Sequence, residues 1–497
     1  MGKIVTTKIT RFDGGMSNDV RSTDFTKGRL VKNFDCLTYP HRLVPLRSSE
    51  DGNDGVIATS ITDFVQAEGK TWAIGRNAST AKTQIVYRSA YSTGSWSQTS
   101  NSVSGSLAPV QGVYPTYYKG AIYGSHGSNS WFKYVTDGGS AFTDNINALS
   151  YTTFAPGLVH SKDDIYYQPY DNKMARNNAG SISSLVLTIP ADLLITSIAE
   201  YNNYVAIGAQ PLSTAGHLNS VVYFWNRDDS LTTFSETVDW GPETLKVLES
   251  VDVELLGVSV VSDSTTNFSP KLVFKRYAGL AGAQKIMELA GDANTTITLD
   301  NHKQKLNGRV YFKATITLDG TVQSGIWSFG KNQQGRYTVT LERLVNNDTA
   351  PNSMYGFLIV GDYTFAAYNN GSSDVVSKTD DSSSAFSATS VYETLKFNQG
   401  DPTTTKKLKG ITVAHNPIPA TGSPSVTLKY KKDGETSFTT IATWNTAALT
   451  AHDAVSIEST GATLPQYSEI QFRIESLGVE ITALTFQEEE IKNAPYA

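Results

Sequence analysis

The stretch that decides the fold reads Tyr204-Val-Ala-Ile-Gly208 and, after a polar loop, Val221-Val-Tyr-Phe-Trp225. Aromatic and β-branched residues suit a pleated, half-buried strand, and glycine suits the turn that follows. This layout of two apolar strands and a turn recurs about seven times between residues 60 and 396. The copies pair 71–75 with 84–88, 121–124 with 131–134, 164–167 with 173–176, 204–208 with 221–225, 255–260 with 271–275, 309–312 with 325–329, and 363–367 with 374–378.

The repeat is about 40–55 residues long, which is the size of a four-stranded propeller blade. We therefore predict an all-β protein whose central part is a β-propeller of about seven degenerate blades, with roughly six to eight possible. No Trp-Asp dipeptide or kelch double glycine marks the copies, so a long β-sandwich or a β-solenoid is the alternative. The propeller is favoured because the strand pairs come in packets separated by longer loops.

The composition is that of an all-β protein. Charged residues make up only 18% of the 497 residues, and aromatic residues make up 10%. Residues 246–256 and 278–289 have helix-like patterns. Both stretches are short, so we assign them to the blades rather than to a helical layer.

The chain is expected to contain three parts and a tail. We predict an N-terminal β segment or arm at 1–55, the β-propeller at 56–396, a C-terminal β-sandwich at 397–490 and a tail at 491–497. The sandwich is predicted because six segments alternate apolar and polar residues, as strands with one wet face do. These segments are 408–413, 425–430, 438–442, 454–458, 469–475 and 479–486.

A propeller closes when one end of the repeat region supplies a strand to the last blade, which removes an exposed sheet edge. Two stretches lie at the ends of the predicted repeat region. We expect the closing strand to come from residues 42–62 or from residues 391–397.

The net charge argues against a firm grip on nucleic acid. The formal net charge is −6 at pH 7, whereas affinity for a phosphate backbone comes from lysines and arginines that release counterions. The one basic run, Lys406-Lys407-Leu408-Lys409, alternates into a strand and is expected to be a solvated face. A mildly acidic protein can still surround DNA without holding it.

Cys36 is the only cysteine, which excludes an intrachain disulfide framework and a multi-cysteine metal site. The count favours folding in a reducing cytoplasm. No run approaches the about 18 apolar residues of a transmembrane helix. The first residues lack the apolar core of a signal peptide. They fit the loose myristoylation pattern, but residues 4–10 also alternate as a first strand.

The sequence carries no recognisable catalytic motif. Its seven histidines are scattered, without partners at metal-ligand spacing, and the G-x-S-x-G, H-E-x-x-H and Walker A patterns are absent. We therefore predict no catalytic residues, no cofactor and no metal site, and hence no enzyme.

Some propellers are glycosidases, which use two carboxylates, or sialidases, which use a tyrosine and an arginine cluster. The candidate acid pairs are Asp163-Asp164, Asp228-Asp229 and Asp380-Asp381. Each pair lies beside a turn, where aspartate bonds its own backbone, so a turn role is expected. Four tryptophans are candidates for stacking on sugars, but each lies in or beside a strand and is expected in the core: Trp96, Trp131, Trp225 and Trp327.

Four segments resemble parts of tailed-phage structural proteins. They are Asn219-Ser-Val-Val-Tyr-Phe-Trp225 continuing to Gly241, Gly325-Ile-Trp-Ser-Phe-Gly-Lys-Asn-Gln-Gln-Gly-Arg-Tyr337, Phe12-Asp-Gly-Gly-Met-Ser-Asn-Asp19 continuing to Asp35, and the strand at 406–413. Together they make the chain resemble the tail nozzle and packaged-DNA stabilisation proteins of short-tailed bacteriophages. Its size is closer to that of the compact stabilisation type.

The resemblance implies a propeller body that carries further β-domains. It implies a ring, expected to be a homo-hexamer, below the portal and adaptor proteins and beside tail fibres or spikes. Such a ring extends the DNA channel and retains packaged DNA until ejection, without sequence-specific binding. The expected location is the virion tail, after synthesis in the host cytoplasm, with no membrane contact. No catalytic residues carry over, because the family has none.

Two other functions stay open. A host-receptor-binding propeller adhesin or tail spike would gather exposed aromatic residues on one propeller face and bind glycans. A propeller glycosidase or sialidase would need two carboxylates or three arginines that converge on the propeller axis.

Overall fold

The computed structural model describes residues 3–17, 24–47, 49–51, 59–77, 82–89, 91, 95–98, 113–125, 131–136, 142–143, 153–212, 219–228, 234–262, 269–279, 282–344, 353–380, 389–399, 401–418, 420–458 and 464–491. The chain divides into two compact units. Unit 1 comprises residues 1–48, 327–348 and 380–497, and unit 2 comprises residues 49–326 and 349–379. The boundary at Ile326 falls within one strand, β28 (Thr321–Lys331).

Unit 2 is built from small antiparallel sheets that follow one another along the chain. Five of them have four consecutive strands. They are β6 (Thr59–Ala67), β7 (Lys70–Asn77), β8 (Thr83–Arg88) and β9 (Ser97–Gln98); β10 (Thr116–Tyr118), β11 (Ala121–Ser125), β12 (Trp131–Val135) and β13 (Phe142–Thr143); β14 (Leu158–His160), β15 (Ile165–Tyr170), β16 (Lys173–Asn178) and β17 (Ser181–Thr188); β18 (Leu193–Tyr201), β19 (Tyr204–Pro211), β20 (Ser220–Trp225) and β21 (Glu236–Gly241); and β22 (Thr244–Val251), β23 (Glu254–Val261), β24 (Lys271–Tyr277) and β25 (Gln284–Ala290).

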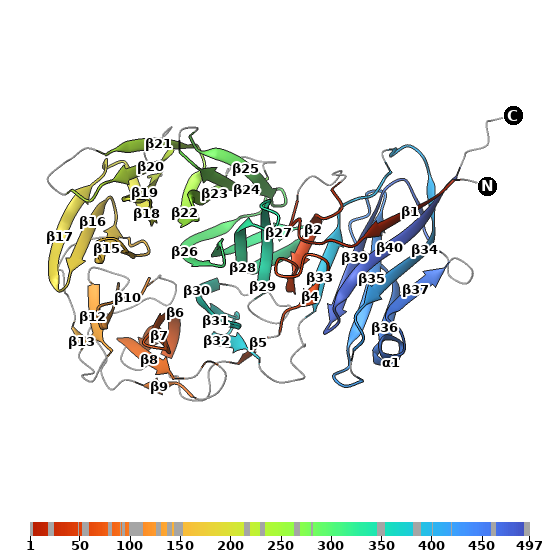
Figure 1. Ribbon diagram of the computed structural model, residues 1–497, viewed down its shortest axis with the longest axis horizontal. Helices are drawn as coiled ribbons and strands as arrows, with labels where there is room; N and C mark the ends of the chain where they lie inside the picture. The colour runs from red at the N-terminus through yellow and green to blue at the C-terminus, as the bar shows by residue number, and fades with distance from the viewer. Residues whose placement is uncertain are drawn as a thin grey trace. The chain divides into compact units, whose positions relative to one another are not determined.

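Two further groups of strands complete unit 2, one at the end of a nine-stranded sheet and one a sheet of four strands. Strands β26 (Thr298–Leu306), β27 (Arg309–Leu318) and β28 are paired in that order, and β30 (Ser353–Val360), β31 (Tyr363–Asn369) and β32 (Asp374–Thr379) form the other sheet with β5 (Ser49–Asp51). Figure 1 shows the sheets of unit 2 arranged around a common centre, with the first strands β6, β18, β22, β26 and β30 on the inner side.

The strand pairs predicted from the repeat are confirmed. In every copy the two segments are the second and third strands of one sheet. Ile207 of β19 pairs with Tyr223 of β20, and Ile122 of β11 pairs with Tyr134 of β12. The helix-like stretches lie in β22, β23 and β25, as assigned. The all-β prediction is also confirmed, since α1 (Thr446–Ala451) is the single helix among the described residues.

An N-terminal strand completes the last sheet of unit 2. In β5, Glu50 pairs with Lys378 of β32, and Asp51 pairs with Ser377. The Lys378 ammonium also forms an ion pair with the Glu50 carboxylate. The closing strand thus lies within the first of the two predicted stretches, 42–62. The second stretch holds β33 (Ser390–Thr394), which pairs with strands of unit 1 instead.

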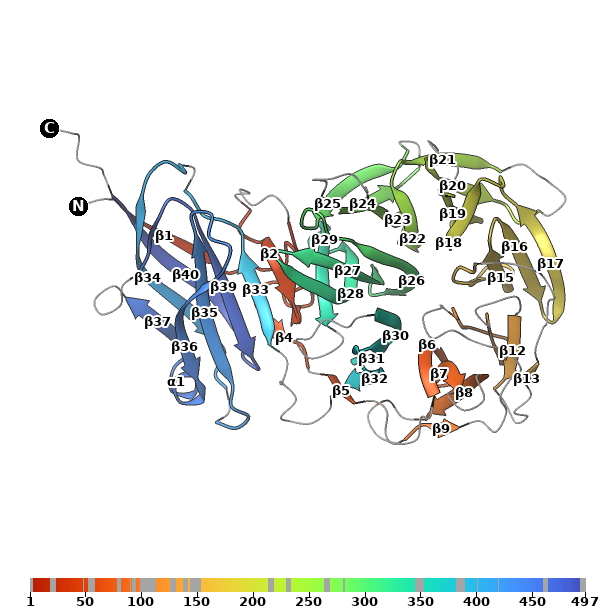
Figure 2. The ribbon, with the colours of Figure 1, turned by 180° about the vertical axis from the view of Figure 1, so that it is seen from behind.

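Unit 1 contains two larger sheets. In one, β28 is followed by β29 (Tyr337–Leu344), β2 (Gly28–Lys32), β33, β39 (Ile470–Leu477), β35 (Ser425–Lys432) and β36 (Thr439–Asn445); in the other, β1 (Ile4–Ile9), β40 (Ile481–Glu490), β34 (Lys406–His415) and β37 (Ala454–Glu458) lie side by side, with β38 (Gln466–Tyr467) also paired to β34. Figure 2 shows these strands from behind. A short ribbon joins β3 (Phe34–Asp35) and β4 (Val44–Pro45).

The two sheets of unit 1 pack through phenylalanines. Phe472 of β39 and Phe486 of β40 have ring centroids 4.9 Å apart, and Phe397 lies 4.8 Å from Phe486. Buried and half-buried residues largely alternate along β34 and β35, as expected of strands with one face in a core. All six strands predicted between residues 408 and 486 are present.

The units divide the chain differently from the predicted segments 1–55, 56–396 and 397–490. Residues 1–48 belong to the same unit as residues 380–497, because β1 pairs with β40 and β2 pairs with β33. Residues 327–348 also join unit 1, because β29 pairs with β2 in parallel. Strand pairing between distant parts of the sequence leaves no local signal, so periodicity alone could not reveal this division.

The double glycine of the N-terminal segment forms a tight turn in unit 1. A Cβ on Gly14 would lie 2.4 Å from Oγ1 of Thr26, so no side chain fits there. Gly15 has a φ of +70°, a conformation that glycine adopts without strain. The amide of Met16 then donates to the carbonyl of Val339, at 2.8 Å.

Asn332 fastens this turn to the hairpin between β28 and β29. Its amide nitrogen donates to the carbonyl and the carboxylate of buried Asp13, both at 3.0 Å. Its amide oxygen accepts the backbone amides of Gln334 and Arg336. The segments around residues 12–35 and 325–337 therefore meet in one packed element.

Replacing Ser49–Asp51 by Gly-Pro-Gly should lower the free energy of unfolding by roughly 2–4 kcal/mol, because the pairing of β5 with β32 is lost. Chemical denaturation followed by tryptophan fluorescence measures the change. Glu50→Gln is the control: it keeps the backbone pairing and loses only a partly exposed ion pair, which is worth about 1 kcal/mol or less. Equal stability of the two variants would show that β5 does not close the sheet.

Asn332→Ala should cost about 1–3 kcal/mol of stability, because buried Asp13 keeps only Arg11 as a side-chain partner and the amides of Gln334 and Arg336 lose their acceptor. The neighbouring Gln333→Ala is the matched control and should change stability by only about 0.5 kcal/mol, since Gln333 is exposed. Thermal unfolding of both variants checks this. A loss of equal size in the two would contradict the proposed fastening role of Asn332.

Candidate functional site

A partly open cavity of about 240 Å³ lies at the centre of unit 2. Its lining comes from the first strand of each sheet, or from residues just before it. In the five longer first strands the lining residues lie in the second half: Asp63–Gln66 of β6, Ile198 of β18, Glu249 of β22, His302–Gln304 of β26 and Phe357–Leu358 of β30. Strands that are remote in sequence therefore bring their side chains to one place.

β-Bulges recur in these first strands. The pairing register shifts around Thr62 in β6, Thr196 in β18, Lys246 in β22 and Tyr355 in β30. Strand β26 has the largest irregularity, because its pairing with β27 is interrupted from Asp300 to His302. A bulge leaves residues unpaired and re-aims their side chains. Here the bulges coincide with a group of polar and charged residues.

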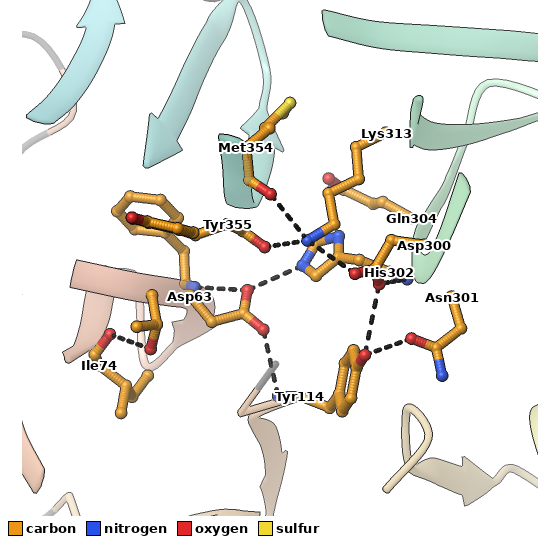
Figure 3. Close-up of polar contacts among 12 residues, drawn as sticks. Asp63, Ile74, Tyr114, Asp300, Asn301, His302, Gln304, Lys313, Met354 and Tyr355 are labelled. Carbon is orange, nitrogen blue, oxygen red and sulfur yellow. Dashed lines mark hydrogen bonds and ion pairs between the residues drawn. The ribbon is translucent and has the colours of Figure 1, made fainter. Parts of the chain in front are cut away.

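We call this group the central polar cluster; its members are Asp63, Tyr114, Lys246, Glu249, Asp300, His302, Lys303 and Lys313. Figure 3 shows most of it. The fully buried carboxylate of Asp63 accepts Nε2–H of His302 at 2.8 Å, and the backbone amides of Phe64 at 2.8 Å and Tyr114 at 3.1 Å. Three separate sheets are joined at this one side chain.

Asp300 forms the second centre of the cluster. Its carboxylate pairs with the Lys313 ammonium at 3.2 Å and accepts the hydroxyl of Tyr114 at 3.3 Å and the backbone amide of His302 at 2.9 Å. Burial raises the pKa of Asp300, but Lys313 and His302 lower it by more, so this pKa lies below its ordinary value. Burial, Asp300 and Asp63 raise the pKa of Tyr114 well above its ordinary value.

Lysines bond to the carbonyl groups of neighbouring sheets. Lys303 pairs with Glu249 at 2.9 Å and donates to the carbonyls of Ile198 and Leu248. Lys313 donates to the carbonyls of Met354 and Tyr355. Strands β26 and β27 thereby contact β18, β22 and β30. Through these contacts the charged members of the cluster other than Lys246 hold neighbouring sheets together.

Lys246 differs from the other lysines of the cluster. It lies at the bulge of β22, is partly buried and has no hydrogen bond or ion pair within the described part of the chain. Burial lowers the pKa of Lys246, and the Asp300 carboxylate opposes that change. Its ammonium is thus within the electrostatic field of the cluster without being a tie.

A second buried histidine joins two other sheets. His160, at the end of β14, has its Nδ1 3.0 Å from the Asp163 carboxylate. Arg227, after β20, donates from Nε to Asp163 at 2.7 Å and from Nη1 to Nε2 of His160 at 3.1 Å. The hydroxyl and amide of Ser161 bond to Glu200 of β18. This arrangement fixes β14 to β18.

The described members of the candidate acid pairs do not line the central cavity. Asp163 pairs with His160 and Arg227, and Asp164 pairs with Lys119 at 3.0 Å. The amide of Asp228 bonds to Asn226, which is a turn contact. Asp380 follows β32, while Asp229 and Asp381 lie outside the described residues. None of the described members lines the cavity.

The tryptophans lie in the core, as predicted. Trp96, Trp131, Trp225 and Trp327 are each at most 2% exposed. Trp96 packs on Phe365, Trp131 on Tyr166, and Trp225 on Tyr167. They supply packing between strands, and these four rings are not exposed for stacking on a glycan.

Sequence reasoning did not find the central polar cluster. One signal was present: the run Asp300-Asn301-His302-Lys303 interrupts a strand whose counterparts in other sheets are apolar. Within the described residues no group of three or more histidine, cysteine or acidic side chains is placed to hold a metal ion. In that same part of the chain, no helix is long and apolar enough to cross a membrane.

No protein-family model and no curated protein matches the chain. Among solved structures it is similar to the computationally designed Ika8 protein, with a TM-score of 0.37, 11% identity, and coverage of 67% of this chain and 99% of that one. It is similar to exo-β-1,3-galactanase from Phanerochaete chrysosporium, with a TM-score of 0.29, 10% identity and coverage of 89% and 99%. A glycoside hydrolase has a TM-score of 0.27, 10% identity and coverage of 88% and 100%. Likenesses this distant carry no conclusion about activity.

Asp300→Asn should destabilise the protein at pH 7 and change its response to acid. The pKa of Asp300 is lower in the folded state than its value of about 3.9 in the unfolded state. The ionised carboxylate therefore contributes fully to folding stability above the unfolded-state pKa, and this stability is lost as pH falls through the folded-state pKa. The difference in melting temperature between wild type and variant should therefore narrow below about pH 4.

The control for this experiment is Asp252→Asn, in the turn after β22, where φ is +54° and asparagine is tolerated. The melting temperature of that variant should equal that of the wild type at every pH. A difference in melting temperature between Asp300→Asn and wild type that stays constant down to acid pH would contradict the role given to Asp300.

Proposed function

We propose that this protein is a structural virion protein of a tailed phage. In this proposal it is a subunit of a tail nozzle or stabilisation ring below the portal and adaptor, which extends the DNA channel and retains packaged DNA until ejection. Unit 2 is the β-propeller body, with seven blades closed by β5. The strands between residues 397 and 490 form a C-terminal β-sandwich within unit 1.

The number of small sheets supports the propeller. Six four-stranded sheets begin with β6, β10, β14, β18, β22 and β30, and the antiparallel strands β26, β27 and β28 at one end of the nine-stranded sheet make a seventh group. The strand that completes the last sheet comes from the N-terminal side of the first, which is how a propeller removes its open edge. Phe472 and Phe486, packed between two sheets, support the sandwich.

One observation carries the family proposal: two segments that resemble nozzle proteins pack against each other. Asp13 and the double glycine come from the N-terminal segment, and Asn332 comes from the segment at 325–337. The residues that suggest the family are thus the residues that build one structural element. A chance likeness in loop sequences would have no reason to converge in this way.

The central polar cluster supports a scaffold rather than an enzyme. A glycosidase needs one carboxylate as an acid and another as a base or nucleophile, both facing a substrate. Here Asp63 is held by three donors, Asp300 by Lys313 and Glu249 by Lys303. Carboxylates committed in this way hold sheets together.

The central polar cluster bears on where DNA would run in this proposal. Side chains of β26 cross the centre of unit 2 and bond to β6, β18 and β22. A duplex therefore cannot pass through one subunit and must run through a channel that several copies surround. The net charge of −6 suits a wall that DNA slides past, because few cations are present to bind phosphates.

Particle mass and symmetry test this proposal. Mass photometry and negative-stain imaging of the purified protein, alone and mixed with portal–adaptor complexes of its phage, should show rings with six or a multiple of six subunits, or density on the adaptor. Portal without adaptor is the control, since the ring should need the adaptor. A trimer would favour a spike, and a monomer without affinity for the complex would contradict the proposal.

A further inference from the structure

The five-stranded sheet of unit 1 ends in two open strand edges. Its main path runs β1, β40, β34, β37, so β1 and β37 are the outer strands. Within the described part of the chain, β1 pairs with β40 alone and β37 pairs with β34 alone. The outer side of such a strand carries backbone groups that another strand can bond.

In β1, three residues turn their backbone groups to the open edge. The amide of Glu490 in β40 donates to the carbonyl of Lys3 at 3.3 Å, and the register of β1 with β40 continues without a bulge. Because bonded and non-bonded pairs alternate in an antiparallel ladder, every second residue from Lys3 onward faces β40. The backbone groups of Ile4, Thr6 and Lys8 therefore face outward, and their side chains are exposed.

In β37, three residues do the same on the opposite side of the sheet. The amide of His415 in β34 donates to the carbonyl of Asp453 at 2.9 Å, and the register of β37 with β34 has no bulge. By the same alternation, the backbone groups of Ala454, Ser456 and Glu458 face away from β34. The side chains of Ser456 and Glu458 are exposed.

The directions of the two edges suit a second copy of the chain. Each neighbouring pair along the path β1, β40, β34, β37 is antiparallel, so β1 and β37 run in opposite directions. A copy that lies alongside in the same orientation therefore brings its β37 antiparallel to β1. Such a contact joins two different surfaces, which is the kind of contact that builds a ring.

One register overlaps all of the outward-facing residues of both strands. It places Thr6 opposite Ser456 of a second copy. Pairs of hydroxyl side chains on facing strands stabilise a sheet. The same kind of pair already exists inside this sheet, where the hydroxyl groups of Thr412 and Ser456 lie 2.9 Å apart.

This register also brings opposite charges together at both ends of the ladder. Lys3 comes within one position of Glu458, and Lys8 comes within one position of Asp453. All four side chains are exposed, and none has an ion pair within the described part of the chain. Pairing of two β1 strands would gather lysines, and pairing of two β37 strands would gather carboxylates. The charges therefore favour β1 with β37.

We propose that β1 of one copy of this chain extends the five-stranded sheet of a second copy by pairing antiparallel with β37, with Thr6 opposite Ser456. This contact rests on the proposed function, since it would join neighbouring subunits of the ring. The two proposals can fail separately. Rings that form without this pairing would refute the contact and leave the ring standing.

Disulfide cross-linking of the concentrated full-length protein tests the pairing. In Thr6→Cys/Ser456→Cys, oxidation should join most chains into covalent oligomers, because bonded antiparallel pairs have Cα atoms about 5.5 Å apart, within the range of a disulfide. Within one chain, β40 and β34 separate the two positions by about 14 Å, so the bond must link two copies. The native Cys36 is buried and does not compete.

The controls fix the register and the partner strand. Thr6→Cys/Glu458→Cys moves one cysteine to a diagonal position and should cross-link at least fivefold more slowly. Equal rates for the two double variants, no cross-link in either, or dimers of Thr6→Cys alone would overturn the proposal. Cross-linked oligomers that never close into rings would support this contact and contradict the ring.

A proline variant tests the backbone contact separately. The amide of Thr6 faces the open edge, so Thr6→Pro removes no hydrogen bond to β40, and an outer strand tolerates proline there. It should keep the circular dichroism spectrum of wild type and need at least tenfold more protein to assemble in mass photometry. Thr6→Val keeps the amide and should assemble like wild type. Assembly of folded Thr6→Pro at the wild-type concentration would refute the contact.

Discussion

The relative position of the strands at the centre of unit 2 depends on one constraint: the buried carboxylate of Asp63 must have hydrogen-bond partners. This side chain is fully buried and accepts hydrogen bonds from its own strand, from Tyr114 ahead of β10 and from His302 of β26. A buried ionised group without partners costs several kcal/mol, so the three elements are held in one relative position. A Cβ on Gly356 would lie 2.6 Å from that carboxylate, so β30 approaches it closely as well.

The strand β26 converts this requirement into a connection between sheets. Its irregular stretch from Asp300 to His302 loses regular pairing with β27 and presents polar side chains to the centre instead. Lys303, next in the chain, then satisfies carbonyl groups of β18 and β22. Strand β26 thus loses backbone hydrogen bonds to β27 and gains side-chain hydrogen bonds to other sheets. That exchange holds β26 against its neighbouring sheets beside the central cavity.

The N-terminal residues serve both units. Residues 4–45 contribute β1 to β4 of unit 1, and residues 49–51 supply the closing strand of unit 2. The contacts of Asn332 with Asp13 show the same principle within unit 1, since two segments more than 300 residues apart in sequence share a buried hydrogen-bond network. Each compact unit is thus assembled from strands that come from distant parts of the sequence. These strands also cover sheet edges that would otherwise be exposed.

By itself, the sequence determined the local structure. Strand pairs such as 204–208 with 221–225, the six strands after residue 408, and the burial of Trp96 and Trp225 follow from apolar alternation and turn residues, which are short-range properties. Only the tertiary structure decided the central polar cluster and the division into units. Asp63 and His302 lie 239 residues apart in the sequence, and no sequence periodicity predicts their contact. Their pairing follows from closing the sheets on one another, because a buried charge takes its partner from whichever strand the completed fold brings near.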